Sequence, residues 1–589
     1  MKKSLLFSAV LAGLMLGSCS SSDDLAGGNT PANQDGNGYV AFNINLPSQA
    51  GSSSRAGSGN DQFDDGTPNE YDVKDATLLI FEGPNESSAT FKSAYKLNTA
   101  PWDDKKVNGN VTTTSATIVK EIDAPASSSN CYALVILNNN GVFKVDESNH
   151  KISFAGETGN FVGDYTKFAT SLSDKDLTKN GFYMANSPLS SVPGGTAAAT
   201  GADITTLVKL EGKIKETEAD AKSSPAQIYV ERGVAKVTMQ NTSTVTSVDG
   251  SQNSAGKSVG FKLSSWALDN TNKNTYLVRS ANGSDKWLDL ATTKPGVTSK
   301  FRFVGSNSVA SGVNLFRTYF AKDANYSDVE NTKAIADGDF KQINAAGITN
   351  GFGNDNPQYC FENTFNVDCQ RDQYTTRVLI KAALNSDQTF FVINGDENTI
   401  FDKTEVEKEI KKYFLTEYKS WIQTHVTGTT SVNEGNLNVT ISDDAGAVTI
   451  TSIEFTGGAS ATSMPTDYQT TVMNRIGTIQ EYKNGEAYYF VRIKHFGDDL
   501  TPWKDGESST PNSTDGVYPA GVDRDNNYLG RYGVLRNNWY DIVVDGVKGL
   551  GFAEVPDVTN DPDDELKSYI AVKINVLSWA KRTQGATLH

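Results

Sequence analysis

Apolar and polar residues alternate one by one near both ends of this chain, and this pattern limits the fold more than any other. The early run covers residues 39–47 and stops at Pro47. The late run covers residues 569–579, with Lys573 and Asn575 on its polar side. A period of two indicates a strand with one buried face. The apolar positions are Val40, Phe42, Ile44 and Leu46 in the early run, and Ile570, Val572, Ile574 and Val576 in the late run.

Other strand-forming segments recur along the chain, separated by turns rich in Asn, Gly or Ser. We predict them at 76–82, 115–122, 131–137, 375–384, 448–456, 486–496 and 539–545. Another strand opens at Ile228, and its apolar parity switches at Gly233, which indicates a β-bulge. The chain is therefore predicted to be mostly all-β.

One helix interrupts this pattern. The segment Thr404–Glu407 has the form of a capping box, the side-chain arrangement that often begins a helix. The apolar residues that follow at helical spacing are Val406, Ile410, Phe414 and Trp421. We expect a small helical insertion that covers one face of a sheet.

The first residues are predicted to direct export. The apolar run 5–16 is too short to span a bilayer, which takes about 20 residues, and fits a secretory signal. It leads into Leu-Gly-Ser-Cys19, in which small residues precede a cysteine as in a bacterial lipoprotein signal. We predict a lipoprotein signal peptide over 1–18, lipid on Cys19 and a flexible tether over 19–38.

The remaining chain is long enough for more than one domain. The segment 216–225 is polar and ends in Pro225, so we place a domain boundary there. This gives an N-terminal domain over 39–224 and a C-terminal domain over 225–589.

The sequence contains no motif that predicts catalysis or metal binding. The net charge is −17, which argues against nucleic-acid binding, and four Cys and four His are too few for a metal array. Phosphate-loop, serine-elbow and zinc-protease motifs do not occur. The acidic residues 556–565 lack the spacing of an EF-hand loop and are interpreted as a solvated linker. We predict no catalytic residue, no metal, no cofactor and no enzyme activity.

Three cysteines remain besides Cys19, namely Cys131, Cys360 and Cys369. An odd number in an exported protein leaves at least one free thiol. Cys360 and Cys369 either pair with each other or stay as buried thiols, and the sequence leaves both open.

Several stretches resemble the fimbrillins, the fimbrial subunits of Bacteroidales bacteria, and most of all the shaft subunit of the short, or minor, fimbriae. They are Ser53–Gly57, Tyr229–Lys236, Tyr359–Thr364, Thr375–Lys381, Gly533–Tyr540 and Val576–Trp579. They occur in family order from about residue 39 to the end of the chain. The regions 240–375 and 385–480 are less similar and are interpreted as insertions.

The resemblance implies two β-sandwich domains of transthyretin-like type. It also implies a precursor that is lipid-anchored to the outer membrane and cut by a trypsin-like, Arg-specific protease. Here the cut would fall between Arg55 and Ala56, which removes residues 39–55. The C-terminal strand region of another copy would then fill the vacated groove, in a cell-surface fimbrium that also contains anchor and tip subunits and supports adhesion and biofilm formation.

Strand physics supports this scheme independently. A sandwich that loses one strand exposes ladder groups and an apolar groove, which favours the addition of another strand. The alternative is that 569–579 pairs permanently within its own domain, which would leave 580–589 as the donated segment. At the level of function, the alternatives are a monomeric surface lipoprotein that binds a host or bacterial surface ligand such as a glycan or protein, and a tip or accessory subunit.

Overall fold

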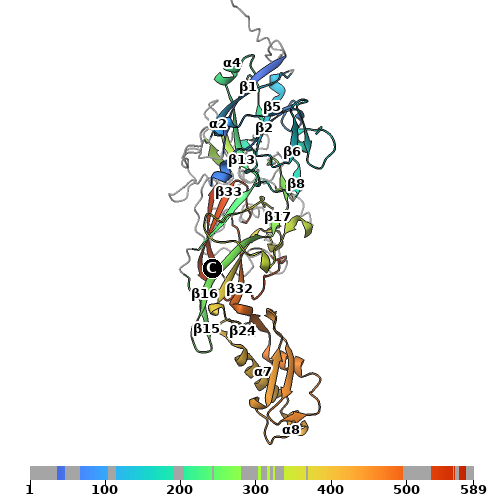
Figure 1. The fold of residues 1–589 in the computed structure, drawn as a ribbon, viewed down its shortest axis with the longest axis vertical. Helices are drawn as coiled ribbons and strands as arrows, with labels where there is room; N and C mark the ends of the chain where they lie inside the picture. The colour runs from blue at the N-terminus through green and yellow to red at the C-terminus, as the bar shows by residue number, and fades with distance from the viewer. Residues whose placement is uncertain are drawn as a thin grey trace, which may run out of the picture.

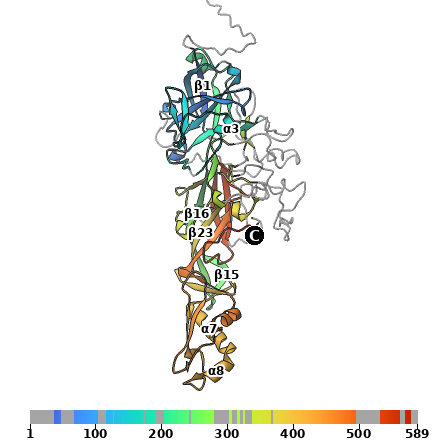
Figure 2. The same ribbon diagram turned by 90° about the vertical axis from the view of Figure 1, so that its right-hand side faces the viewer.

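The three largest hydrophobic cores of the described residues follow one another along an elongated molecule (Figure 1). We call the parts built around them the N-terminal, middle and distal lobes. The view turned by 90° shows the same order (Figure 2). The computed structural model describes residues 36–46, 67–103, 115–125, 127–173, 175–190, 204–241, 245–279, 303–306, 315–318, 323–325, 337–365, 369–494, 532–561, 563 and 570–578. The predicted mostly all-β fold is confirmed.

The N-terminal lobe is built on one large sheet in the order β3-β2-β5-β9-β13-β1-β4, and β12 also pairs with β5. Its strands are β1 (Asn37–Asn45), β2 (Ala76–Glu82), β3 (Thr90–Lys96), β4 (Ser115–Asp123), β5 (Cys131–Leu137), β6 (Phe143–Asp146), β7 (Lys151–Phe154), β8 (Ser171–Ser173), β9 (Met184–Asn186), β12 (Val208–Lys209) and β13 (Ala226–Arg232). Its helices are α1 (Pro68–Tyr71), α2 (Ala100–Asp103), α3 (Tyr165–Phe168) and α4 (Glu218–Ser223). β6 and β7 form a separate hairpin.

Two sheets enclose the core of the middle lobe, in the orders β22-β14-β33-β34 and β25-β15-β16-β23-β32. Their strands are β14 (Ala235–Gln240), β15 (Ser247–Asn253), β16 (Ser258–Asp269), β22 (Gln358–Cys360), β23 (Arg377–Leu384), β25 (Thr399–Ile400), β32 (Glu486–Arg492), β33 (Asn538–Val547) and β34 (Ile570–Ser578). Short strands β10 (Leu189–Ser190), β11 (Ile204–Thr205), β19 (Phe303–Ser306) and β20 (Leu315–Thr318) form a further small sheet, while β17 (Thr271–Asn272) pairs with β21 (Phe340–Lys341) and β18 (Asn274–Tyr276) with β8.

The distal lobe contains the predicted helix and lies at the far end of the molecule (Figure 1). Its elements are β24 (Phe390–Ile393), α7 (Lys403–Glu417), α8 (Lys419–His425), β26 (Val426–Thr427), β27 (Leu437–Ile441), β28 (Gly446–Ala447), β29 (Ile450–Phe455), β30 (Ser460–Ala461), α9 (Tyr468–Ile476) and β31 (Ile479–Tyr482). β24 joins two cores, because Phe390 belongs to the middle core and Phe391 to the distal core.

The helix begins two residues before the expected capping box. Asp402 is the capping residue: its Oδ1 accepts a hydrogen bond from the Glu405 N–H, and Glu405 Oε2 accepts one from the Asp402 N–H. The predicted apolar residues Val406 and Phe414 are buried, as is Ile410. Trp421 lies in the separate helix α8, because α7 ends at Glu417.

The chain passes from the N-terminal lobe to the middle lobe after β13, further along the sequence than the polar segment 216–225. We call this passage the crossing. That segment contains α4, which is capped by Thr217 and buries only Ala221. The following strand β13 joins the N-terminal sheet, so the parity switch at Gly233 marks the passage from one core to the next. A polar surface helix and a linker have similar compositions, so the sequence alone does not distinguish them in this segment.

The acidic segment near the C-terminus is anchored to the middle lobe at two of its described residues. The Thr559 N–H donates to the Asp372 carboxylate at 2.9 Å. Asp563 is fully buried and accepts a hydrogen bond from the Thr375 hydroxyl at 2.6 Å. The interpretation of 556–565 as a solvated linker is therefore wrong at Asp563, whereas Asp557 and Thr559–Asp561 are exposed as expected.

Candidate strand-exchange site

The first strand occupies an interior position in its sheet. β1 runs parallel to β13 on one side and antiparallel to β4 on the other. Phe42, for example, lies opposite Ala226 of β13 and Ile118 of β4. If β1 were absent, two strand edges would face each other across a slot one strand wide, and both would carry unpaired backbone groups.

One face of β1 is embedded in the N-terminal core. Three core-facing residues of β1 and the residue that follows it are 0–4% exposed, namely Val40, Phe42, Ile44 and Leu46. Burying a large apolar side chain stabilises a fold by roughly 1.5–3 kcal/mol, so these four give on the order of 6–12 kcal/mol before ordering costs. A segment that fills the same slot needs a similar apolar face.

The other face of β1 is tied to its neighbour by polar contacts. The Asn43 amide donates to Gln227 Oε1 at 2.9 Å, and the Asn45 amide donates to the Ile228 carbonyl at 3.1 Å. The predicted lipidation residue Cys19 and the predicted cleavage site Arg55–Ala56 lie outside the described residues. Their roles stay predictions.

The last strand has a different position. β34 lies at the end of the sheet β22-β14-β33-β34 and pairs antiparallel with β33. The register places Ile574 opposite Ile542 and Val576 opposite Tyr540; Val572 lies opposite Val544, and Ile570 opposite Val547. In this single chain, β34 therefore has the intradomain pairing that the sequence left open as an alternative to donation.

A short stretch of chain connects the two sheets. β13 is the neighbour of β1. β14, which is separated from Arg232 by only two residues, is the neighbour of β33. The Gly233 N–H donates to the Tyr183 carbonyl at 2.9 Å. A side chain at Gly233 would meet the Tyr183 ring at 3.0 Å, so the crossing is closely packed.

Buried charges hold this crossing. Lys236 on β14 and Glu70 on α1 form an ion pair of 2.8 Å in which both side chains are at most 1% exposed. The Tyr359 hydroxyl donates to the same carboxylate, and the Lys236 ammonium lies 3.9 Å from the centre of the Trp539 ring. Burial, together with the Glu70 charge, raises the pKa of Tyr359. A buried ion pair is stable only when the other hydrogen-bonding positions of its charged groups are filled. The Glu70 carboxylate meets this condition, because it also accepts from Tyr359 and from the Thr67 N–H.

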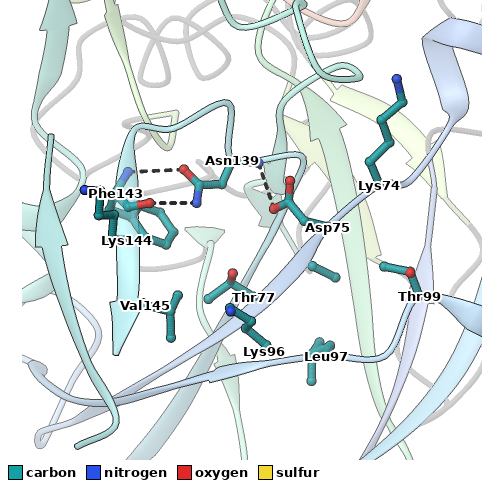
Figure 3. Close-up of a pocket in the computed structure, with 11 residues that line it drawn as sticks. Lys74, Asp75, Thr77, Lys96, Leu97, Thr99, Asn139, Phe143, Lys144 and Val145 are labelled. Carbon is teal, nitrogen blue, oxygen red and sulfur yellow. Dashed lines mark hydrogen bonds between the residues drawn. The ribbon is translucent and has the colours of Figure 1, made fainter. Parts of the chain in front are cut away.

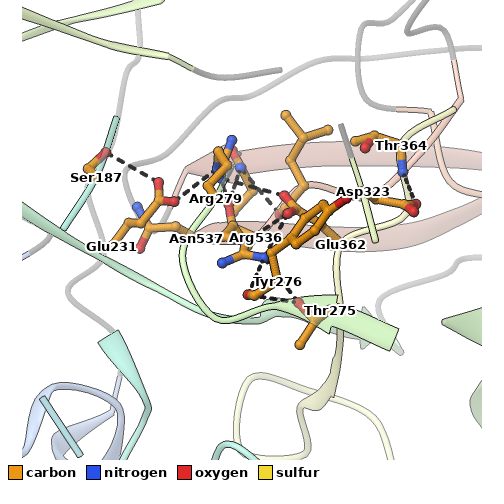
Figure 4. A network of polar contacts seen from close by, with 12 residues as sticks. Ser187, Glu231, Thr275, Tyr276, Arg279, Asp323, Glu362, Thr364, Arg536 and Asn537 are labelled. Carbon is orange, nitrogen blue, oxygen red and sulfur yellow. Dashed lines mark hydrogen bonds and ion pairs between the residues drawn. The ribbon is translucent and has the colours of Figure 1, made fainter. Parts of the chain in front are cut away.

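A second buried network joins the same lobes (Figure 4). The Arg279 guanidinium lies 2.9 Å from Glu231 on β13 and 3.8 Å from Glu362. Arg536 lies 2.7 Å from the other oxygen of Glu362 and also donates to the Tyr276 carbonyl. Charges alternate along this chain of contacts, so each is neutralised by its neighbours.

The stretches that carry the family resemblance meet at this junction. Tyr229–Lys236 supplies Glu231 and Lys236, Tyr359–Thr364 supplies Tyr359 and Glu362, and Gly533–Tyr540 supplies Arg536 and Trp539. Sequence reasoning did not identify the network. Charged residues inside otherwise apolar strands were the available signal, because a buried charge requires a partner.

The described cysteines are buried. Cys131 and Cys360 are free thiols, so Cys360 does not pair with Cys369. Burial raises the pKa of Cys131 and of Cys360 to about 12, which leaves both thiols protonated and unreactive at neutral pH.

No helix in the described ranges is both long and apolar enough to cross a membrane. Nor do these ranges contain a group of three or more His, Cys, Asp or Glu side chains suited to a metal ion.

Residues 517–585 match the family model for the major fimbrial subunit protein type IV, fimbrillin, C-terminal. The chain carries a fimbrillin C-terminal region. The resemblance to the fimbrillins is thereby confirmed, and the matched segment contains both β33 and β34. No relative is found among curated protein sequences.

Solved structures with distant similarity include fimbrial and adhesion proteins. A putative cell adhesion protein from Parabacteroides distasonis is 10% identical, with a TM-score of 0.34 and coverage of 92% of this chain and 98% of that chain. A fimbrilin from Porphyromonas gingivalis is 12% identical, with a TM-score of 0.34 and coverage of 94% and 99%. A tip fimbrial protein from the same organism is 11% identical, with a TM-score of 0.26 and coverage of 91% and 99%. At such TM-scores, the assignment rests on the fimbrillin sequence match.

Proposed function

We propose that this protein is a structural subunit of a cell-surface fimbrium, exported as a lipoprotein on Cys19, cut after Arg55, and polymerised by strand exchange. The observation that supports this most directly is the interior position of β1 between β13 and β4. Cleavage in the loop behind β1 would release one strand and leave a slot with two free edges and an apolar floor. A strand from a second copy would pair with both free edges and cover the apolar floor.

The C-terminal strand region is the proposed donor. β34 has β33 as its one strand partner within the described residues, so releasing β34 would break a single ladder. Donation to a neighbour is a head-to-tail contact, and such contacts generate open filaments rather than closed dimers. Other fimbrillin subunits, including anchor and tip proteins, are the proposed partners, and the shaft is the proposed position.

A second candidate is a monomeric surface lipoprotein with adhesive function. The pairing of β34 with β33 in the same chain favours it, because both sheets are then complete without a partner. The two candidates differ in whether removal of β1 leads to polymers.

Limited trypsin digestion of the purified precursor tests this difference. We expect concentration-dependent ladders on native gels that resist mild denaturant, and N-terminal sequencing of the polymer should begin at Ala56. The precursor Arg55→Gln is the matched control: trypsin cannot cut it after position 55, so we expect β1 to stay in place and no ladder to form. A cleaved protein that stays monomeric at every concentration would favour the second candidate.

Crosslinking from position 574 identifies the donated segment. If β34 is donated, a photoreactive residue there should crosslink to β13 or β4 of another subunit in the filament. Crosslinks to β33 of the same chain in mature filaments would instead assign donation to 580–589. Cys19→Ala should release the precursor from membranes; a variant that still fractionates with the outer membrane would contradict lipidation.

A further inference from the structure

β4 forms one edge of the slot that β1 fills, yet β1 is its one ladder partner within the described residues. The order β13-β1-β4 means that β4 keeps no partner among the described strands once β1 has left. Three residues of β4 pack in the N-terminal core, namely Ala116, Ile118 and Ile122. Because β1 contributes to the same core, its release also weakens this packing. A slot that receives another strand therefore needs a second means of holding β4.

Side chains from the opposite end of the same sheet contact β4 directly. β3 is the last strand at that end, and its Tyr95 hydroxyl accepts a hydrogen bond from the Asp123 N–H of β4 at 3.0 Å. His150 Nδ1 lies 3.0 Å from Asp123 Oδ2. The Tyr95 and His150 rings lie 4.5 Å apart, and the Lys120 ammonium of β4 lies 5.8 Å from the centre of the Tyr95 ring. These side chains join the two ends of the sheet.

The elements that carry these side chains are fixed by bonds that do not involve β1. His150 ends the turn between β6 and β7, and its carbonyl accepts a hydrogen bond from the Ala94 N–H of β3 at 2.9 Å. Asn139, just before β6, anchors the β6–β7 hairpin to the start of β2: its N–H donates to Asp75 Oδ1 at 3.1 Å (Figure 3). Its amide and Oδ1 also bond the Phe143 carbonyl and N–H. This side of the contact should therefore keep its place when β1 leaves.

We propose that Tyr95 and His150 form a clasp that holds β4 in position after β1 has left, so that the slot keeps both edges for an incoming strand. They are positioning residues, because they contact β4 rather than the strand that enters. The inference deepens the proposed function and rests on the release of β1. It is independent of which segment is donated and of whether filaments form.

Binding of a β1 peptide to the cut protein tests the clasp. The probe is a fluorescent peptide that copies residues 37–46, which occupy the slot in the intact chain. The precursor is cut by limited trypsin digestion, separated from the released segment by size-exclusion chromatography and kept dilute, and fluorescence anisotropy measures probe binding. We expect the cut wild type to bind the probe, whereas the uncut precursor, whose slot is filled, should not. A probe carrying Phe42→Asp should not bind either protein.

The clasp variant is Tyr95→Phe with His150→Asn. Phenylalanine keeps the ring but removes the acceptor of the Asp123 N–H, and asparagine suits the left-handed backbone of His150, whose φ is 49°. Once cut, this variant should bind the probe at least about tenfold more weakly than the cut wild type. The melting temperature of the uncut variant should fall by no more than a few degrees, because β1 then still pairs with β4.

The matched control variant is Lys96→Gln with Lys151→Gln, on the same strand and hairpin. These lysines join β3 to the β6–β7 hairpin: Lys96 is ion-paired with Glu147 at 2.6 Å, and the Lys151 ammonium donates to the Lys92 carbonyl at 2.9 Å. The cut control variant should bind the probe as tightly as the cut wild type does, because the contacts of Tyr95 and His150 with β4 remain.

Several outcomes would overturn the proposal. A cut wild type that does not bind the probe would show that the slot does not persist without β1. Equal affinities in the cut clasp variant and the cut wild type would show that the clasp does not hold β4. An uncut clasp variant that melts far below the control variant would show a general structural role. By contrast, clasp-dependent probe binding by a cut protein that never polymerises would support the clasp and contradict strand exchange between subunits.

Discussion

β1 and β34 carry nearly the same pattern in the sequence and occupy opposite situations in the fold. β1 lies inside a sheet with a neighbour on each side, and its apolar residues belong to the N-terminal core. β34 lies at the end of a sheet beside β33. Alternation predicts that a strand has one buried face, but it does not predict how many strands flank it.

This difference matters for how each strand can leave. Removing β1 breaks two ladders and exposes the apolar groove, so under native conditions it should require a cut in the chain. Detaching β34 breaks the β33 ladder alone. The enclosed position of β1 would keep the groove filled until the chain is cut. The edge position of β34 would let this strand exchange one partner strand for another.

The largest effect is expected from a charge in the enclosed strand. Phe42→Asp removes a fully buried ring and buries a carboxylate without a partner, which should cost more than about 4 kcal/mol. Asn43→Asp is the control, because it places the same charge on the partly exposed face of β1. Urea unfolding of the precursor measures both. If Phe42→Asp and Asn43→Asp lower the free energy of unfolding equally, the two faces of β1 are not distinct.

The junction between the two sheets should respond almost as strongly. Glu70→Gln keeps the shape of the side chain but leaves Lys236 buried without a counter-charge, which should cost about 3–5 kcal/mol. The matched control is Glu218→Gln, which breaks an exposed pair with Lys222 and should change the free energy of unfolding by less than about 1 kcal/mol.

We also expect the Glu70→Gln variant to lose the coupling between the two lobes. Unfolding monitored separately in each lobe should coincide in the wild type and separate in the variant. A variant that unfolds in one step with wild-type stability would show that the buried pair does not hold the crossing.

The enclosed strand β1 and the junction between the two sheets also differ in how well the sequence predicts them. The bounds of β2 and β5 were predicted to the residue, and β1 to within two residues, because their alternation or apolar runs are local signals. The Glu70–Lys236 pair joins residues far apart in the chain, and no local pattern encodes such a contact. The long strand β16 was missed altogether, within a region interpreted as an insertion.

Hydrogen exchange should separate the two strands directly. Amides of β1 face either β13 or β4, so nearly all should exchange slowly in the uncut precursor. In β34, amides that point away from β33 lack a strand partner within the described residues, so roughly half should exchange quickly. Mass spectrometry of peptic peptides covering each strand measures this. Equal protection would show that β34 is covered on its second edge and is not poised to leave.

The smallest expected effect is a pH dependence confined to the lobe that holds β1. Burial raises the pKa of Glu86 to about 7, against the hydrogen bonds that its carboxylate accepts from the Thr206 and Leu207 N–H groups. Because the folded state binds this proton more tightly than the unfolded state does, the contribution is fully present below the ordinary pKa of about 4.5 and is lost as the pH rises through 7. Glu86→Gln cannot titrate but can still accept both hydrogen bonds. The melting temperature of its N-terminal lobe should therefore change less between pH 5 and pH 8 than that of the wild type, by a few degrees, while the middle lobe that holds β34 behaves identically in both proteins. An unchanged pH dependence of the N-terminal lobe in Glu86→Gln would show that this carboxyl does not govern it.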